Sequence, residues 1–159
     1  MLEEKFEDFL DKLELDLVRE GWYSESSLSF RGKRERSYEN PEFEMALTHS
    51  GNLAFSEIRT VLHNSKYFWE FHLGGEIKPT EEIFPHELLR FKQFAIRNSD
   101  QSRPYHHQLT FTADSAEDNG LVYERTVMGH INSFKGNEII CYNGTEVYVA
   151  DFKGLKIKC

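Results

Sequence analysis

The stretch EIICYNGTEVYVADFKG, residues 138–154, constrains the fold more than any other part of the chain. Two runs rich in β-branched and aromatic residues flank the pair Asn143-Gly144. This pair predicts a β-hairpin, because the type I′ turn that suits paired strands needs a positive φ at both central residues. The predicted cross-strand pairs are Tyr142–Thr145, Ile140–Val147 and Ile139–Tyr148. Both faces of the hairpin would be apolar, so we expect it to be covered on both sides and central in a sheet.

Two segments have the residue spacing of amphipathic helices. The first covers residues 2–20, where acidic residues crowd the first two turns and Gly21 supplies a stop. Its apolar stripe consists of Leu2, Phe6, Phe9, Leu10, Leu13 and Leu17. The second covers residues 86–97, just after Pro85, which a helix tolerates only near its start. Its buried stripe would consist of Leu88, Phe91 and Ala95.

Alternating apolar and polar residues predict further strands. They cover residues 43–49, 55–63, 66–73, 107–114 and 121–128, and shorter strand patterns lie at 22–23 and 28–30. We expect Gly74-Gly75 to end the third of these strands. A chain of 159 residues is typical of one domain. The order of elements predicts a single α+β domain over residues 1–159, with a mostly antiparallel β-sheet, an N-terminal amphipathic helix and a second mid-chain helix.

The acidic charge of the chain is concentrated at its N-terminal end. The net charge of −8 argues against general nucleic-acid binding, which needs a basic surface. Residues 1–20 hold eight acidic residues and three basic ones. If the apolar stripe of the first helix packs on the sheet, an exposed acidic face is left, made of Glu3, Glu7, Asp11 and Glu14. Two interpretations are open: this face binds a protein partner with a basic surface, or it is only solvated.

The segment RGKRER, residues 31–36, concentrates basic residues in an expected loop. Its basic residues are Arg31, Lys33, Arg34 and Arg36. One interpretation is a contact with phosphate or with an acidic partner. The other is a solvated loop, which is the more common situation. This segment alone keeps a nucleic-acid role open.

Three residues are candidates for acid–base catalysis. In the predicted strand 66–73 the apolar residues share one face, which leaves Glu70 and His72 together on the other. An acid and an imidazole can form a general acid–base pair if they line a cavity, with Glu138 as a third member. The alternative is an ordinary charged pair on a solvent face.

Metal ligands, disulfides and targeting segments find no support in the sequence. The seven histidines show no recognised metal-ligand spacing, so no metal or cofactor is predicted. The two cysteines, Cys141 and Cys159, do not make a disulfide framework. The N-terminus lacks the basic and apolar regions of a signal peptide, and no apolar run approaches the ~18 residues that a membrane span needs. We therefore expect a cytoplasmic protein.

Residues 121–154 combine turn glycines and strand residues in a familiar pattern. The residues that form it are Tyr123, Gly129, Phe134, Gly136, Glu138, Ile139, Ile140 and Gly154. In this pattern the stretch resembles an uncharacterised bacterial domain that is sometimes attached behind a helix-turn-helix DNA-binding module in regulators. Glu124-Arg125 stand where that family has an acidic residue, and Val127 replaces its aromatic residue. The resemblance implies a small sensing or binding domain and no defined reaction.

These observations together favour a non-enzymatic binding protein of bacterial or phage type. Its most concrete form is an immunity-like, antitoxin-like or other inhibitory protein, because small acidic proteins suit basic targets. The alternatives are a small-ligand-binding domain or hydrolase that uses Glu70, His72 and Glu138, and a protein similar to secretion chaperones. Glu70 and His72 facing solvent would favour the binding protein, whereas their convergence with Glu138 in a deep pocket would favour the enzyme.

Overall fold

A computed structural model describes residues 1–19, 33–97, 109–112 and 120–157 of the chain. Its two helices are α1 (Leu2–Arg19) and α3 (Pro85–Arg97), counted within those residues. The strands are β1 (Lys33–Glu39), β2 (Phe43–Gly51), β3 (Ala54–His63), β4 (Lys66–Ile77), β5 (Leu109–Thr112), β6 (Leu121–His130), β7 (Ser133–Tyr142) and β8 (Thr145–Lys156). The strand patterns expected at 22–23 and 28–30 lie outside the described residues.

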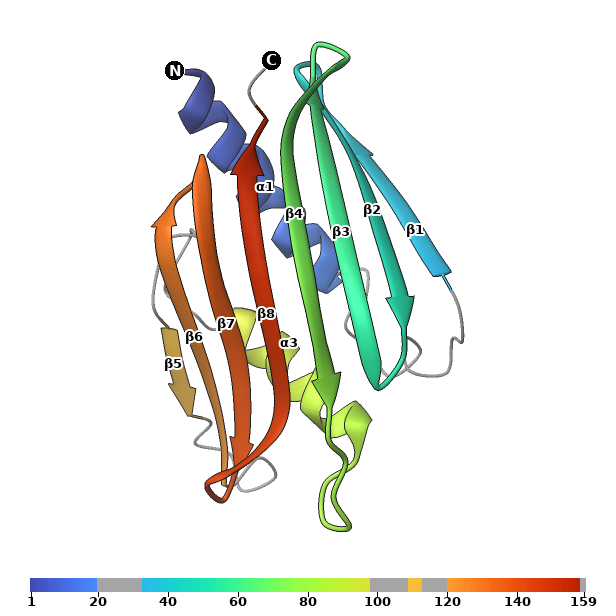
Figure 1. Cartoon of the computed structure of the whole chain (residues 1–159), viewed down its shortest axis with the longest axis vertical. Helices are drawn as coiled ribbons and strands as arrows, with labels where there is room; N and C mark the ends of the chain where they lie inside the picture. The colour runs from blue at the N-terminus through green and yellow to red at the C-terminus, as the bar shows by residue number, and fades with distance from the viewer. Residues whose placement is uncertain (20–32, 98–108, 113–119, 158–159) are drawn as a thin grey trace.

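The strands of the described ranges form one eight-stranded antiparallel sheet in the order β1-β2-β3-β4-β8-β7-β6-β5. Two meanders, β1 to β4 and β5 to β8, meet where β4 pairs with β8. Both helices lie behind the sheet in Figure 1, so they cover one face, which we call the inner face. The opposite face, which we call the outer face, is covered by neither of them. The predicted α+β class with an antiparallel sheet is confirmed.

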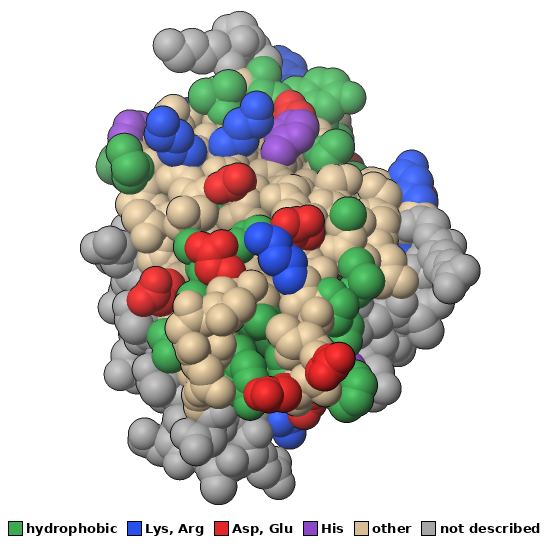
Figure 2. Space-filling model, turned by 60° about the horizontal axis from the view of Figure 1, so that its bottom comes forward, with side chains coloured by type: hydrophobic (Ala, Val, Ile, Leu, Met, Phe, Trp, Pro, Cys, Tyr) green, Lys and Arg blue, Asp and Glu red, His purple; other side chains and the backbone are tan. Residues whose placement is uncertain are grey.

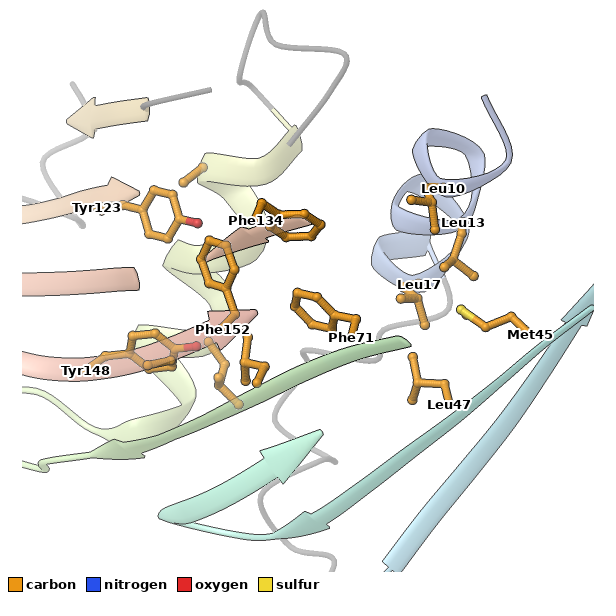
Figure 3. Packing of buried hydrophobic residues seen from close by; sticks show 14 of the residues in the cluster. Leu10, Leu13, Leu17, Met45, Leu47, Phe71, Tyr123, Phe134, Tyr148 and Phe152 are labelled. Carbon is orange, nitrogen blue, oxygen red and sulfur yellow. The ribbon is translucent and has the colours of Figure 1, made fainter. Parts of the chain in front are cut away.

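Helix α1 packs its apolar stripe on the inner face. The Phe6 ring lies 4.9 Å from the Phe68 ring of β4, measured between centroids. Figure 3 shows leucines of the same stripe facing Met45 and Leu47 of β2. Leu2 is 38% exposed, so the packed stripe begins one turn later than the sequence predicts. Each fully buried Leu or Phe contributes about 1.5–3 kcal/mol.

Helix α3 begins where its sequence satisfies the free backbone donors of a first turn. The backbone N–H of Phe84 donates to the Glu87 carboxylate at 2.6 Å, and Pro85 has no N–H to satisfy. The predicted stripe of Leu88, Phe91 and Ala95 is fully buried, which confirms the orientation of this helix.

The expectation that Gly74-Gly75 ends a strand is wrong. Strand β4 runs on to Ile77, and its residues pair with β3 on one side and β8 on the other. Because both ladders satisfy the backbone groups of these glycines, tertiary pairing outweighs the low strand propensity of glycine.

The Asn143-Gly144 turn is confirmed, with φ angles of 48° and 81°. The Tyr142–Thr145 pair next to it is also confirmed. Beyond this pair the predicted register is wrong, because a β-bulge shifts it between Ile140 and Cys141. The pairs beyond the shift include Ile140–Tyr148 and Ile139–Val149.

The hairpin is central in the sheet as predicted, since β8 lies between β4 and β7. The expectation that it is covered on both sides is wrong. On its inner face Ile140 and Tyr148 are fully buried, but on its outer face Ile139 and Val149 are only half-buried. The reason is that both helices lie on the inner face.

Candidate functional site

A network of buried polar side chains lies on the inner face, centred on Glu138 of β7. Lys92 of α3 places its Nζ 2.8 Å from the Glu138 carboxylate and donates to the Tyr148 hydroxyl at 2.8 Å. The Tyr148 and Tyr123 hydroxyls both donate to Glu138, at 3.1 and 3.0 Å. Arg125 in turn donates to the Tyr123 hydroxyl at 2.9 Å. Each tyrosine therefore links a cation to the same carboxylate, and both rings are visible in Figure 3.

The surroundings of Glu138, Tyr123 and Tyr148 determine the protonation state of each side chain. Burial alone would raise the pKa of Glu138, but the charges of Lys92 and Arg125 and the hydrogen bonds that it accepts outweigh burial and lower it. Burial, with Glu138 nearby, raises the pKa of Tyr148 well above its ordinary value. Burial also raises the pKa of Tyr123. Glu138 is therefore ionised and both tyrosines are neutral around pH 7, so each tyrosine hydroxyl can donate to the carboxylate.

A second buried network joins α1 to the sheet. Arg59 of β3 forms an ion pair with Glu14 of α1, and its guanidinium lies 2.7 Å from the Glu57 carboxylate. His49 of β2 places its Nδ1 3.5 Å from the Glu57 carboxylate. Arg59 also lies over the Phe71 ring, 5.1 Å from its centroid. Ionic contacts between two elements in the interior fix how the helix sits on the sheet, since a partner left alone there would be costly.

The predicted acidic face of α1 is therefore partly wrong, because Glu14 is buried with only 9% of its surface exposed. Glu14 lies four residues after Leu10 and three before Leu17, which puts it on the buried stripe. Glu3 is exposed, while Glu7 and Asp11 are half-buried.

The basic segment 31–36 does not form a loop over the residues that are described. Arg31 lies outside them, and Lys33 begins strand β1. Alternate side chains of a strand point to opposite faces, so the bases are divided. Lys33 pairs with Glu35 at 2.6 Å, whereas Arg34 is half-buried and its pKa is lowered by that burial. Arg36 is exposed. Among the three described bases, Lys33 therefore points to the opposite face from Arg34 and Arg36, and these three do not form one patch.

The catalytic candidates do not converge. Glu70 and His72 of β4 hydrogen-bond to each other on the outer face, and each side chain is 40% exposed. Glu138 lies buried on the inner face of the same sheet. The sheet therefore separates the two halves of the proposed acid–base site.

The outer face is hollowed by an open groove of about 630 Å³ over β3, β4, β8, β7 and β6. One cross-strand row runs through it, and each member pairs with the next: Ile58, His72, Lys153, Lys135 and Met128. Figure 2 shows basic and histidine side chains next to one another near the top of that view, beside exposed apolar side chains. We call this row with its groove the outer groove.

Sequence reasoning missed the outer groove, although a sequence feature points to it. The tripeptide Phe-Lys-Gly occurs twice, at 134–136 and 152–154, and the paired strands bring the two lysines opposite each other. Like charges at directly opposite positions destabilise a sheet. Among the described residues, neither Lys135 nor Lys153 forms an ion pair with a carboxylate.

A family model matches residues 47–157, which is most of the chain: Domain of unknown function (DUF5680). The chain belongs to the DUF5680 family. The expected resemblance to an uncharacterised domain family is confirmed, and the match extends well beyond residues 121–154. No curated protein and no solved structure is significantly similar to the chain.

The DUF5680 match contains both the Glu138 network and the outer groove, whereas Glu14 and strand β1 lie before its first residue. In the described part of the chain, no group of three or more His, Cys, Asp or Glu side chains could hold a metal ion. Burial and the charges of Glu124 and Glu146 raise the pKa of the Cys141 thiol, which disfavours the reactive thiolate. Neither α1 nor α3 is long and apolar enough to cross a membrane.

Proposed function

We propose that this DUF5680 chain is a non-enzymatic cytoplasmic binding domain whose ligand lies in the outer groove. The observation that supports it most is the position of the acid–base candidates. Glu70 and His72 contact each other on the outer face of the sheet. Glu138 is buried on the inner face, where it forms an ion pair with Lys92. With these groups separated, a hydrolase that combines them has no common site.

The size and lining of the outer groove favour a small molecule as its ligand. Small-molecule sites have volumes of roughly 300–1,000 Å³ and combine apolar surface with a few polar groups. The groove volume of about 630 Å³ falls in this range. Its lining contains two exposed apolar residues, Ile58 and Met128, one at each end of the row, and polar residues between them. A small sensing domain, which the resemblance implies, would need such a site.

A basic protein partner is a second candidate, and a different surface supports it. Glu3, Glu4 and Asp8 are exposed in the first two turns of α1, and the chain carries a net charge of −8. An immunity-like or antitoxin-like role would use this end of the helix. The burial of Glu14 leaves that surface smaller than the sequence suggested.

The three methionines provide a direct test of the outer groove as a binding site. Met128 lies in the groove and is 61% exposed, Met45 is buried under α1, and Met1 is at the N-terminus. With ¹³C-methyl methionine, NMR reports each position separately. We expect an eight-carbon amphiphile (octanoate, octanol or octylamine) to shift the Met128 signal and leave the Met45 signal in place. A shift of Met45 alone, or no shift of Met128 with any of the three, would reject the proposal.

A further inference from the structure

We propose that the outer groove is a site for an organic anion, with its acidic head group at Lys135 and Lys153 and its apolar body along the groove. This inference rests on the proposed binding function and names the class of ligand. The two lysines face each other across β7 and β8, and His72 pairs with Lys153 from the other side. Strands β7 and β8 therefore bring two lysines together at the centre of the row, beside a histidine that hydrogen-bonds to Glu70.

Lys135 and Lys153 differ from the other described lysines because they lie directly opposite each other on paired strands. Four other lysines meet a carboxylate within 3.4 Å, in the pairs Lys5–Glu42, Lys33–Glu35, Lys78–Glu76 and Lys92–Glu138. Within the described ranges neither Lys135 nor Lys153 has such a partner, although Asp151 lies two residues from Lys153 on the same face. An anion placed between the two ammonium groups would relieve their repulsion and gain charge-assisted hydrogen bonds.

Gly74 supplies independent support, because the fold does not require a glycine there. It lies in the outer groove beside Asp151, and a Cβ at Gly74 would meet only the Phe55 carbonyl oxygen, at 3.9 Å. Glycine within a strand weakens it and often marks a place that a ligand approaches closely. The missing side chain keeps the floor of the groove open next to the basic row.

The apolar residues at the two ends of the row indicate that the ligand has an apolar body as well as an acidic head group. Ile58 is 40% exposed and Met128 is 61% exposed, and they lie on either side of the basic centre. An inorganic anion would leave both apolar side chains in water. A carboxylate or phosphate ester with an apolar body of several carbons would cover Met128, which pairs directly with Lys135, and this fits the amphipathic lining of the groove.

The test compares head groups on one apolar body by titration of the Met128 methyl signal. Octanoate and octyl phosphate, below their micelle concentrations, should bind at least about tenfold more tightly than octanol or octylamine, because charge-assisted hydrogen bonds add to apolar burial. Inorganic phosphate alone should bind more weakly than octyl phosphate. Whichever of the two anions binds more tightly identifies the head group.

Substitutions in the outer groove test the anion site separately from the proposed binding function. Lys135→Gln with Lys153→Gln should reduce octanoate affinity about tenfold or more, whereas the matched control Lys66→Gln, an exposed lysine in the β3–β4 hairpin, should leave it unchanged. Gly74→Val should block all four amphiphiles, and an unmoved Met45 signal shows that each variant is folded. Equal affinity for octanoate and octylamine, or unchanged octanoate affinity in the double variant, would reject the anion site without rejecting the proposed binding function. If no probe moves Met128, both proposals fail.

Discussion

Gly74 and Gly75 are consecutive residues of β4, and only Gly75 is required by its neighbours. A Cβ at Gly75 would lie 2.7 Å from the Ala150 Cβ and would also clash with the Val149 carbonyl oxygen. A Cβ at Gly74 would be in ordinary contact with a single atom, the Phe55 oxygen. One glycine therefore permits close pairing of β4 with β8, while the other opens the outer groove.

Alanine at these two positions should have opposite effects on stability. Gly74→Ala should stabilise the fold by about 0.5–1 kcal/mol, because it reduces the entropy of the unfolded chain without strain. Gly75→Ala should destabilise it by about 1–3 kcal/mol, because the strands must move apart. Urea unfolding of the two variants measures both values. Destabilisation of similar size by the two changes would contradict the different roles of these glycines.

The Lys92–Glu138 ion pair should behave as a buried, coupled pair. Glu138→Gln removes the carboxylate that Lys92 and Arg125 share, and Lys92→Met removes the nearest cation, so each change should cost about 3–5 kcal/mol. The double variant should cost less than the sum by more than about 1 kcal/mol. A double-mutant cycle by urea unfolding measures this coupling.

The exposed pair Lys78–Glu76 is the control for that cycle. Its atoms lie 3.4 Å apart, but both side chains are about half exposed, so the same cycle should give less than about 1 kcal/mol. Equal coupling in the two pairs would mean that burial does not strengthen the Glu138 network.

Acid should weaken the fold through Glu138. Its pKa is lowered in the folded protein, so the unfolded chain takes up the proton first as the pH falls. The stabilisation by Glu138 is therefore complete at neutral pH and decreases as the pH falls below the ordinary carboxyl range toward the lowered pKa. Urea unfolding between pH 7 and pH 3 should show a smaller acid-side loss in Glu138→Gln than in the unchanged chain. Parallel curves would show that other carboxyl groups cause the loss.

Much of the fold could be predicted because side-chain periodicity depends only on the local chain. The strand period of two and the helical period of 3.6 identify elements without knowledge of their partners. The turn at Asn143-Gly144 is equally local, because it needs only positive φ angles. What the local pattern does not contain is the register beyond the turn.

The outer groove depends on that register. In the register predicted from the turn, Lys135 would lie opposite Phe152, and the bulge next to Cys141 moves Lys153 into that position. Bulges arise from packing on both strands, which a local pattern does not report.

The position of Glu14 was predicted wrongly for a different reason. Its charge suggested that the side chain is exposed to solvent, although its spacing from Leu10 puts it on the buried stripe. Its partner Arg59 is 45 residues away and comes close only through the fold.

Glu14 should matter for stability far more than its neighbours on α1. Glu14→Ala removes one of the two carboxylates that contact the buried Arg59 in the ion pairs described above, and it should cost more than about 2 kcal/mol. Glu3→Ala, at an exposed position of the same helix, should change stability by less than about 0.5 kcal/mol. Thermal and urea unfolding check both. Similar small effects would mean that the Glu14–Arg59 ion pair does not hold α1 on the sheet.

The acidic end of α1 gives the last prediction, for any basic protein that proves to bind this chain. Glu3→Lys with Glu4→Lys and Asp8→Lys should slow association about tenfold or more at low salt and flatten its salt dependence, because exposed charges act mainly on the rate of encounter. Stopped-flow measurements over a salt series test this. The matched control is Glu44→Lys with Glu124→Lys and Glu146→Lys, which makes the same change of charge at exposed strand residues outside α1. Equal slowing by both variants would show that the total charge sets the rate, and unchanged association of the helix variant would reject the helix as the protein-binding surface.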